Sequence, residues 1–202
     1  MTKKSFKLIA NFVYEAGILS KTPRSGLWFL GTGRQTVSEH LYRTTMIGYA
    51  LAHLVPKANK QRLIFLCLIH DFAEGRTSDL NYVHQKYGRL AESQAFDDIA
   101  RMLPFGKEMR DAYIEEQAKV TLESKLAKDA DNLEWIATLS EEAAKGNTKA
   151  RQWVASAVKR LKTPAAKKLG RLLLATHPDA WWFNKKDKWF VNRDAKLRPW
   201  KR

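Results

Sequence analysis

The sequence has few of the features that mark several common classes of protein. Cys67 is the one cysteine among 202 residues, so no intrachain disulfide can form, and a reducing cytoplasm is expected. The longest apolar run, residues 63–69, has seven residues and is too short to span a bilayer. P-loop glycines, a GxSxG motif and a CxxC pair are missing. These absences argue against P-loop NTPases, α/β-hydrolases and zinc ribbons.

Acidic residues are scarce relative to basic ones. The chain has 21 Asp and Glu against 36 Lys and Arg, which gives a net charge of +15. Such a charge favours polyanions or anionic small molecules as partners, but a solvated, lysine-rich surface has the same composition. The excess is densest in residues 181–202, where Trp and Phe alternate with basic residues. This is typical of a single-strand nucleic-acid platform, and equally of a segment that packs its aromatics on the core. We favour the second interpretation.

The remaining pattern is helical. A chain of 202 residues with 45% hydrophobic and 28% charged residues can bury one core. Residues 21–35 and 76–88 are predicted to be loops, and Thr36 with Glu39 forms a capping box. The N-terminal residues are basic, but polar side chains interrupt the apolar stretch, which favours an amphipathic helix over a secretory signal. The predicted fold is an all-α bundle with helices at residues 5–19, 36–54, 59–74, 89–103, 107–117, 119–145, 147–161 and 164–176.

Titratable residues end the most apolar segment of the chain. The run LIFLCLI is followed directly by His70 and Asp71, and then by Glu74. On the predicted helix, His70 and Glu74 lie one turn apart on one face. Buried charges are costly unless they are paired or bound to metal, so the His-Asp doublet is a candidate pair of metal ligands. The alternative is a helix end that reaches the surface at Gly75, and this segment alone leaves both interpretations open.

Other parts of the chain complete an ordered set of motifs. These are TPRSG (22–26), TVSEHLYR (36–43), IHDFAE (69–74), SDL (78–80) and KDADNLEW (128–135). Together, over about residues 7–140, they resemble the HD-domain metal-dependent phosphohydrolases, and in particular their 5'-deoxynucleotidase-like branch. The resemblance implies an HD-domain helical bundle in residues 1–180. Residues 181–202 are then a basic aromatic C-terminal segment and not a separate domain.

The resemblance also implies a metal site. The implied ligands are His40, His70, Asp71 and Asp131. A mixed nitrogen and oxygen set suits one divalent ion, for which we favour Mn²⁺, Co²⁺ or Fe²⁺ over Mg²⁺, Ni²⁺ or Zn²⁺. Helical periodicity by itself favours Asp129 as the inward carboxylate, because it lies near the apolar face of the predicted helix 119–145. The family match favours Asp131, which requires that this helix be covered on two sides.

The same resemblance implies roles around the metal. Glu74 would orient or deprotonate the attacking water, and Asp79 would lie near the sugar, where it can meet a 3'-hydroxyl. Arg24 would approach the substrate phosphate, which suits a guanidinium. Trp28 and Arg34 are further candidates for substrate binding.

Other titratable residues have weaker arguments for a functional role. Arg43 can face the site or form a structural salt bridge. His53, His84 and His177 have no partner at ligand spacing, so we expect them to be structural or to lie at the surface.

The expected activity is metal-dependent hydrolysis of nucleoside 5'-monophosphates, in particular deoxy ones, to nucleoside and phosphate. A homodimer is expected from the resemblance alone, and nothing indicates a membrane partner. One alternative is an HD hydrolase of another phosphate ester, such as a dNTP, a cyclic or oligonucleotide diester, or an alarmone. The other is a nucleic-acid-binding protein that uses residues 181–202 as an arm.

Overall fold

Helices are the regular secondary structure of the described part of the chain. The computed structural model describes every residue except 1, 184, 187, 189–191, 194–195 and 197–202. The described residues form eleven helices and no strand, and one isolated bridge pairs Pro23 with Thr36. This confirms the predicted all-α fold class. No described helix is long and apolar enough to cross a membrane.

The helices agree in large part with the predicted ones. Their bounds are α1 (Lys3–Ile18), α2 (Gly26–Leu30), α3 (Val37–Leu54), α4 (Lys60–Ile69), α5 (Glu74–Thr77), α6 (His84–Tyr87), α7 (Glu92–Met102), α8 (Gly106–Ala118), α9 (Leu122–Ala144), α10 (Thr148–Val158) and α11 (Pro164–Ala175). The predicted capping box is present at the start of α3, where Thr36 and Glu39 exchange hydrogen bonds. The short helices α2, α5 and α6 lie in or next to segments predicted as loops.

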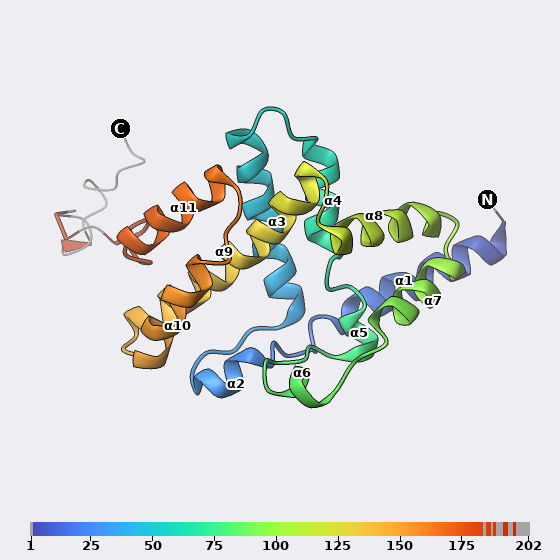
Figure 1. Cartoon of the computed structure of the whole chain (residues 1–202), viewed down its shortest axis with the longest axis horizontal. Helices are drawn as coiled ribbons and strands as arrows, with labels where there is room; N and C mark the ends of the chain where they lie inside the picture. The colour runs from blue at the N-terminus through green and yellow to red at the C-terminus, as the bar shows by residue number, and fades with distance from the viewer. Residues whose placement is uncertain (1, 184, 187, 189–191, 194–195, 197–202) are drawn as a thin grey trace.

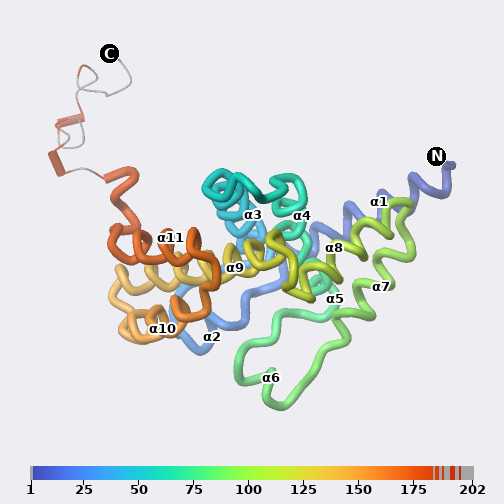
Figure 2. Tube along the Cα trace, turned by 45° about the horizontal axis from the view of Figure 1, so that its top comes forward, coloured from blue at the N-terminus to red at the C-terminus, as the bar shows by residue number. Residues whose placement is uncertain are grey.

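The helix α9 is the centre of the bundle. It packs against α3, α4, α8, α10 and α11. Both views place α3, α4 and α9 in the middle of the molecule, with α10 and α11 at one end and α1, α7 and α8 at the other (Figures 1 and 2). Buried residues recur all along α9 and around its circumference, from Ser124 to Glu142. Because α9 is covered on more than one side, carboxylates on different faces of it can both be buried.

The helices α3 and α4 approach each other closely at a glycine. A Cβ atom at Gly48 would lie 2.6 Å from Sγ of Cys67, closer than carbon and sulfur can approach without displacement. Gly48 on α3 and Cys67 on α4 are both buried. The contact therefore fixes the distance between the helix that carries His40 and the helix that ends at His70.

One predicted helix is divided, and this changes the geometry around the His-Asp doublet. The helix predicted for residues 59–74 ends at Ile69, with His70 as its C-cap. The ring Nδ1 of His70 donates to the carbonyl of Cys67 at 2.9 Å. The backbone continues in tight turns, with Phe72 N donating to Ile69 O at 3.0 Å. The prediction that His70 and Glu74 share one helical face is therefore wrong, because Glu74 begins a new helix.

The C-terminal aromatic residues that the structure describes differ in their exposure. The exposed fractions are 86% for Trp181, 49% for Trp182 and 37% for Phe183. The favoured interpretation, in which this segment packs its aromatics on the core, is wrong for Trp181. Trp189, Phe190 and Trp200 lie outside the described residues.

The close approach at Gly48 predicts a stability change. Replacing Gly48 with alanine should lower the free energy of unfolding by about 1–3 kcal/mol, because the added methyl group overpacks the contact with Cys67. The control is Gly17→Ala, since a Cβ at Gly17 meets nothing within 4 Å. That change should be neutral or stabilising by up to about 1 kcal/mol, through helix propensity. Urea denaturation measures both, and equal effects of the two changes would contradict this account of the helix contact.

Candidate metal centre

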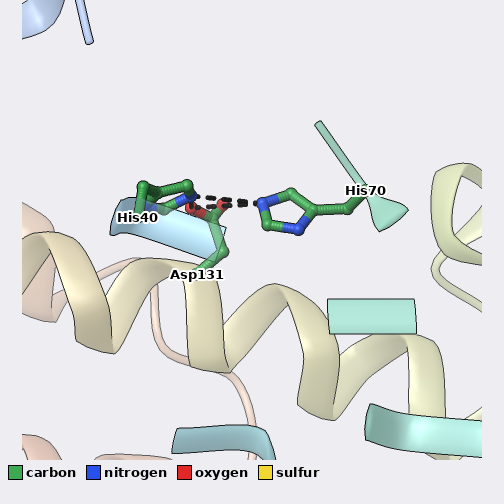
Figure 3. A group of neighbouring side chains, drawn as sticks. All are labelled: His40, His70 and Asp131. Atoms are coloured by element: carbon green, nitrogen blue, oxygen red, sulfur yellow. Dashed lines mark hydrogen bonds and ion pairs between the residues drawn. The ribbon is translucent and has the colours of Figure 1, made fainter. Parts of the chain in front are cut away.

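Four side chains from three parts of the bundle converge at one point. His40 projects from α3, His70 and Asp71 from the turn after α4, and Asp131 from α9. The Nε2 atoms of the two histidines lie 3.2 Å apart, and the Asp131 carboxylate lies between their rings in the close-up view (Figure 3). His40, His70 and Asp131 form a group whose potential ligand atoms all lie within 4.8 Å of one another.

Both aspartates place an oxygen beside the imidazole nitrogens. Oδ2 of Asp71 lies 3.4 Å from Nε2 of His40 and 3.3 Å from Nε2 of His70. Oδ1 of Asp131 lies 3.4 Å and 4.0 Å from the same two nitrogens. The structure thus brings together the four residues that the resemblance implies as ligands, although Asp71 is not in the tightest group.

The outer nitrogens of both rings are already engaged. Nδ1 of His70 must donate to the Cys67 carbonyl, because a carbonyl oxygen only accepts. Nδ1 of His40 donates at 2.8 Å to Oε2 of Glu134. In the neutral rings, each Nε2 therefore carries a lone pair directed at the shared point. Two lone pairs and two carboxylates facing one another repel unless a cation or protons lie among them, so this donor set fits a divalent ion.

Asp129 and Asp131 have different environments despite their proximity in sequence. The carboxylate of Asp129 accepts from the backbone N–H groups of Lys162 at 2.8 Å and Thr163 at 2.7 Å. Asp129 thereby secures the turn that begins α11, and it is fully buried. Asp131 faces the histidines from another side of α9. The aspartate that helical periodicity favours therefore joins α9 to the turn before α11.

A second group of charges lies next to the four candidate ligands. Nη1 of Arg24 lies 3.0 Å from Asp71, 3.7 Å from Asp79 and 4.0 Å from Glu74. Oδ2 of Asp79 accepts from the backbone N–H of Ser25 at 2.7 Å, which joins the 78–80 segment to the start of α2. Arg24, Glu74 and Asp79 are therefore one cluster beside the metal centre.

Glu74 is the least satisfied member of this cluster. Its Oε2 atom is buried and has no hydrogen-bond partner among the described residues. Burial, together with the negative charges of Asp71 and Asp79, raises the pKa of Glu74 to about 10. Without added positive charge, this carboxyl group is therefore protonated at neutral pH.

Two functional candidates were missed in the sequence. Nζ of Lys128 lies 2.5 Å from Oδ2 of Asp131, and Glu134 binds His40. Burial raises the pKa of Glu134, but the hydrogen bond from His40 and the charge of Arg43 lower it by more. The net result is a pKa of about 2. Lys128 and Glu134 lie three residues before and after Asp131, hence about one turn away on the same side of α9. This three-residue spacing from Asp131 is the sequence feature that could have identified Lys128 and Glu134.

The remaining substrate candidates line a separate hollow. Arg24, Trp28 and Arg34 all line a cavity of about 610 Å³ between α2 and the loop that follows it. The four candidate ligands do not line this cavity. Trp28 is 59% exposed. The centroids of its ring and the His84 ring lie 6.1 Å apart, in a T-shaped arrangement. Arg24 thus lines this hollow and also contacts Asp71 at the metal centre.

The other titratable residues form contacts away from the centre. Arg43 bridges Glu134 and Glu141, as the structural interpretation of this residue predicted. His84 contacts Asn81 in addition to Trp28, and the ring of His53 lies against Tyr49. His177 lies 3.8 Å from Asp179.

The chain is similar in sequence to known proteins. The sequence model of the HD domain matches residues 16–172. A Danio rerio protein named 5'-deoxynucleotidase HDDC2 is 32% identical over 132 residues, which cover 62% of this chain and 64% of the relative. The Homo sapiens protein of that name is 27% identical over 139 residues, covering 66% of this chain and 67% of the relative. This chain thus spans about two thirds of the length of these curated relatives.

The fold has a similar solved structure. A conserved hypothetical protein from Pyrococcus furiosus superposes with a TM-score of 0.73 at 25% sequence identity. The superposition covers 85% of this chain and 100% of the other.

The protonation of the centre predicts how metal affinity depends on pH. Burial lowers the pKa of both imidazoles, but the neighbouring carboxylates raise the pKa of each by more, to above its usual value. A metal ion must displace these imidazole protons, so affinity should rise with pH. We expect binding of Mn²⁺ to be at least about tenfold tighter at about pH 8 than at about pH 6.

Calorimetry in buffers of different ionisation enthalpy measures both the affinity and the number of protons released. Affinity that does not change with pH, with no release of protons, would contradict the described protonation of the centre.

Proposed function

The chain belongs to the HD-domain family of metal-dependent phosphohydrolases, and we propose that it hydrolyses nucleoside 5'-monophosphates, deoxy ones in particular, to nucleoside and phosphate. The observation that carries the proposal is the convergence of two imidazole Nε2 atoms and two carboxylates at one point. The choice of substrate is supported by the name of the relatives, 5'-deoxynucleotidase, and by the cationic side chains around the centre.

The proposed ligands of one divalent ion are His40, His70, Asp71 and Asp131. Their mixed nitrogen and oxygen donors suit Mn²⁺, Co²⁺ or Fe²⁺. When bound, the ion supplies a Lewis acid that polarises the phosphoryl group and lowers the pKa of water. Lys128 holds Oδ2 of Asp131 at 2.5 Å, which leaves Oδ1 facing the histidines. Arg24 contacts Oδ2 of Asp71 at 3.0 Å, the oxygen that also faces Nε2 of both histidines.

Glu74 is the proposed general base. Its buried Oε2 atom has no hydrogen-bond partner among the described residues, so it can accept a hydrogen bond from the attacking water. Positive charge added at the neighbouring ligands offsets the charges of Asp71 and Asp79, which lowers the pKa of Glu74 from about 10 toward the working range. A carboxyl group that ionises only when the site is loaded is suited to accept a proton at that stage.

Two cations are available for the phosphate. Arg24 lies among the carboxylates of Asp71, Glu74 and Asp79, and its guanidinium can exchange one of these contacts for phosphate oxygens. Lys128 has a side chain that is 44% exposed and can contribute a second positive charge. Placed between them, a phosphate dianion would meet positive charge on two sides.

The sugar and base would extend toward α2. Oδ1 of Asp79 lies 3.7 Å from Arg24, while its Oδ2 is held by Ser25, so Oδ1 is the proposed partner of the 3'-hydroxyl. Trp28 and Arg34, which line the adjoining cavity, are the proposed contacts of the base. The homodimer and a nucleic-acid-binding role for residues 181–202 stay predictions.

Phosphate release tests the proposed function. Wild-type protein with Mn²⁺, Co²⁺ or Mg²⁺ should release phosphate from dNMPs or NMPs, and a chelator should abolish the release. Glu74→Gln keeps the size of the side chain but removes the base, so kcat should fall by about 10²- to 10⁴-fold while metal binding persists. Exposed Glu108 on α8 provides the control, since Glu108→Gln should leave kcat unchanged.

The substrate panel should also contain dNTPs and a phosphodiester. Release from these substrates alone would favour the other phosphate esters. If metal binds but no monophosphate is hydrolysed, the nucleotidase proposal is wrong.

A further inference from the structure

Glu134 is a buried glutamate that none of the proposed catalytic steps uses. It lies on α9 about one turn after Asp131, and its side chain is 0% exposed. One of its oxygens, Oε2, accepts the Nδ1–H of His40 at 2.8 Å. His40 is itself 0% exposed, so water cannot replace this partner.

The other oxygen of Glu134 is held by three donors. Oε1 accepts from Nε2 of Gln35 at 2.7 Å, from Nε of Arg43 at 2.9 Å and from Oγ1 of Thr138 at 3.0 Å. These donors come from the loop before α3, from α3 itself and from α9. Arg43 also binds Glu141 at 2.5 Å, which restrains the guanidinium in turn. With four donors on two oxygens, the carboxylate has a fixed orientation.

The Glu134 carboxylate restricts the tautomer of His40. An imidazole has two neutral tautomers, and only the one protonated at Nδ1 leaves Nε2 free as a ligand. A carboxylate can only accept, so Glu134 selects that tautomer and fixes the plane of the ring. Its negative charge also makes Nε2 a better donor to a cation.

We propose that Glu134 is a positioning residue for the metal centre, which sets metal affinity through the tautomer and orientation of His40. Gln35, Arg43 and Thr138 hold the Glu134 carboxylate in place for this task. The inference rests on the proposed function only in taking His40 as a metal ligand. The competing explanation is an ion pair between α3 and α9 that contributes to stability alone.

Metal binding without substrate distinguishes the two explanations. Glu134→Gln keeps the volume of the side chain, but its amide can present a donor to Arg43 and Gln35 and removes the charge behind His40. Titration calorimetry with Mn²⁺ should give an affinity about 10- to 100-fold weaker than wild type. The matched control is Glu142→Gln, because Glu142 is also a buried glutamate of α9, is 4% exposed and pairs with Lys145. Its affinity should stay within about twofold of wild type.

Two outcomes of this experiment need to be distinguished. If Glu134→Gln binds Mn²⁺ as tightly as wild type and changes only the unfolding midpoint, Glu134 is structural. Wild-type protein that binds metal but hydrolyses nothing would refute the proposed function and leave this comparison valid. The two failures are therefore separable.

A second measurement needs no variant. In wild-type protein with ¹⁵N-labelled histidine and Zn²⁺, NMR should show His40 protonated at Nδ1, with a slowly exchanging proton, and metallated at Nε2. Metal on Nδ1, or no proton there, would refute the role of Glu134 even if Glu134→Gln does not fold.

Discussion

The rest of the site depends on the electrostatic repulsion among acceptor atoms that the fold brings together at one buried point. Two buried imidazoles present Nε2 atoms 3.2 Å apart, and their Nδ1 protons are already engaged by Glu134 and by the Cys67 carbonyl. Two aspartate oxygens meet them there. Such a set of acceptors cannot remain together without positive charge. The fold supplies the positions: α3, α4 and α9 meet at the centre of the bundle, and Gly48 allows α3 and α4 to approach closely enough.

Positive charge around the centre is divided among several side chains. Arg24 faces Asp71, Glu74 and Asp79, while Lys128 faces Asp131. These side chains balance part of the carboxylate charge. The same cations would be attracted to an anionic substrate, so the charge that stabilises the free site is also suited to phosphate. The net charge of +15 extends this attraction over the rest of the molecule.

The fold class could be predicted from the sequence, because helical periodicity and the capping box at Thr36 are local signals. The four candidate ligands followed from the resemblance of the ordered motifs to those of the HD-domain family. The helix break at His70 could not be predicted, since residues 59–74 contain neither the proline nor the glycine that usually marks one. Helical periodicity favoured Asp129 over Asp131 as the ligand, because it cannot distinguish the faces of a helix that, like α9, is buried on several sides. Glu134 was overlooked, and the exposure of Trp181 shows that composition alone does not fix packing.

The most direct test of the central claim is anomalous diffraction from crystals of the wild-type protein grown with Zn²⁺, recorded on both sides of the zinc absorption edge. The account predicts one peak with Nε2 of His40, Nε2 of His70 and oxygens of Asp71 and Asp131 about 2.0–2.2 Å away. A peak at other residues, or none at this point when zinc is bound in solution, would contradict it.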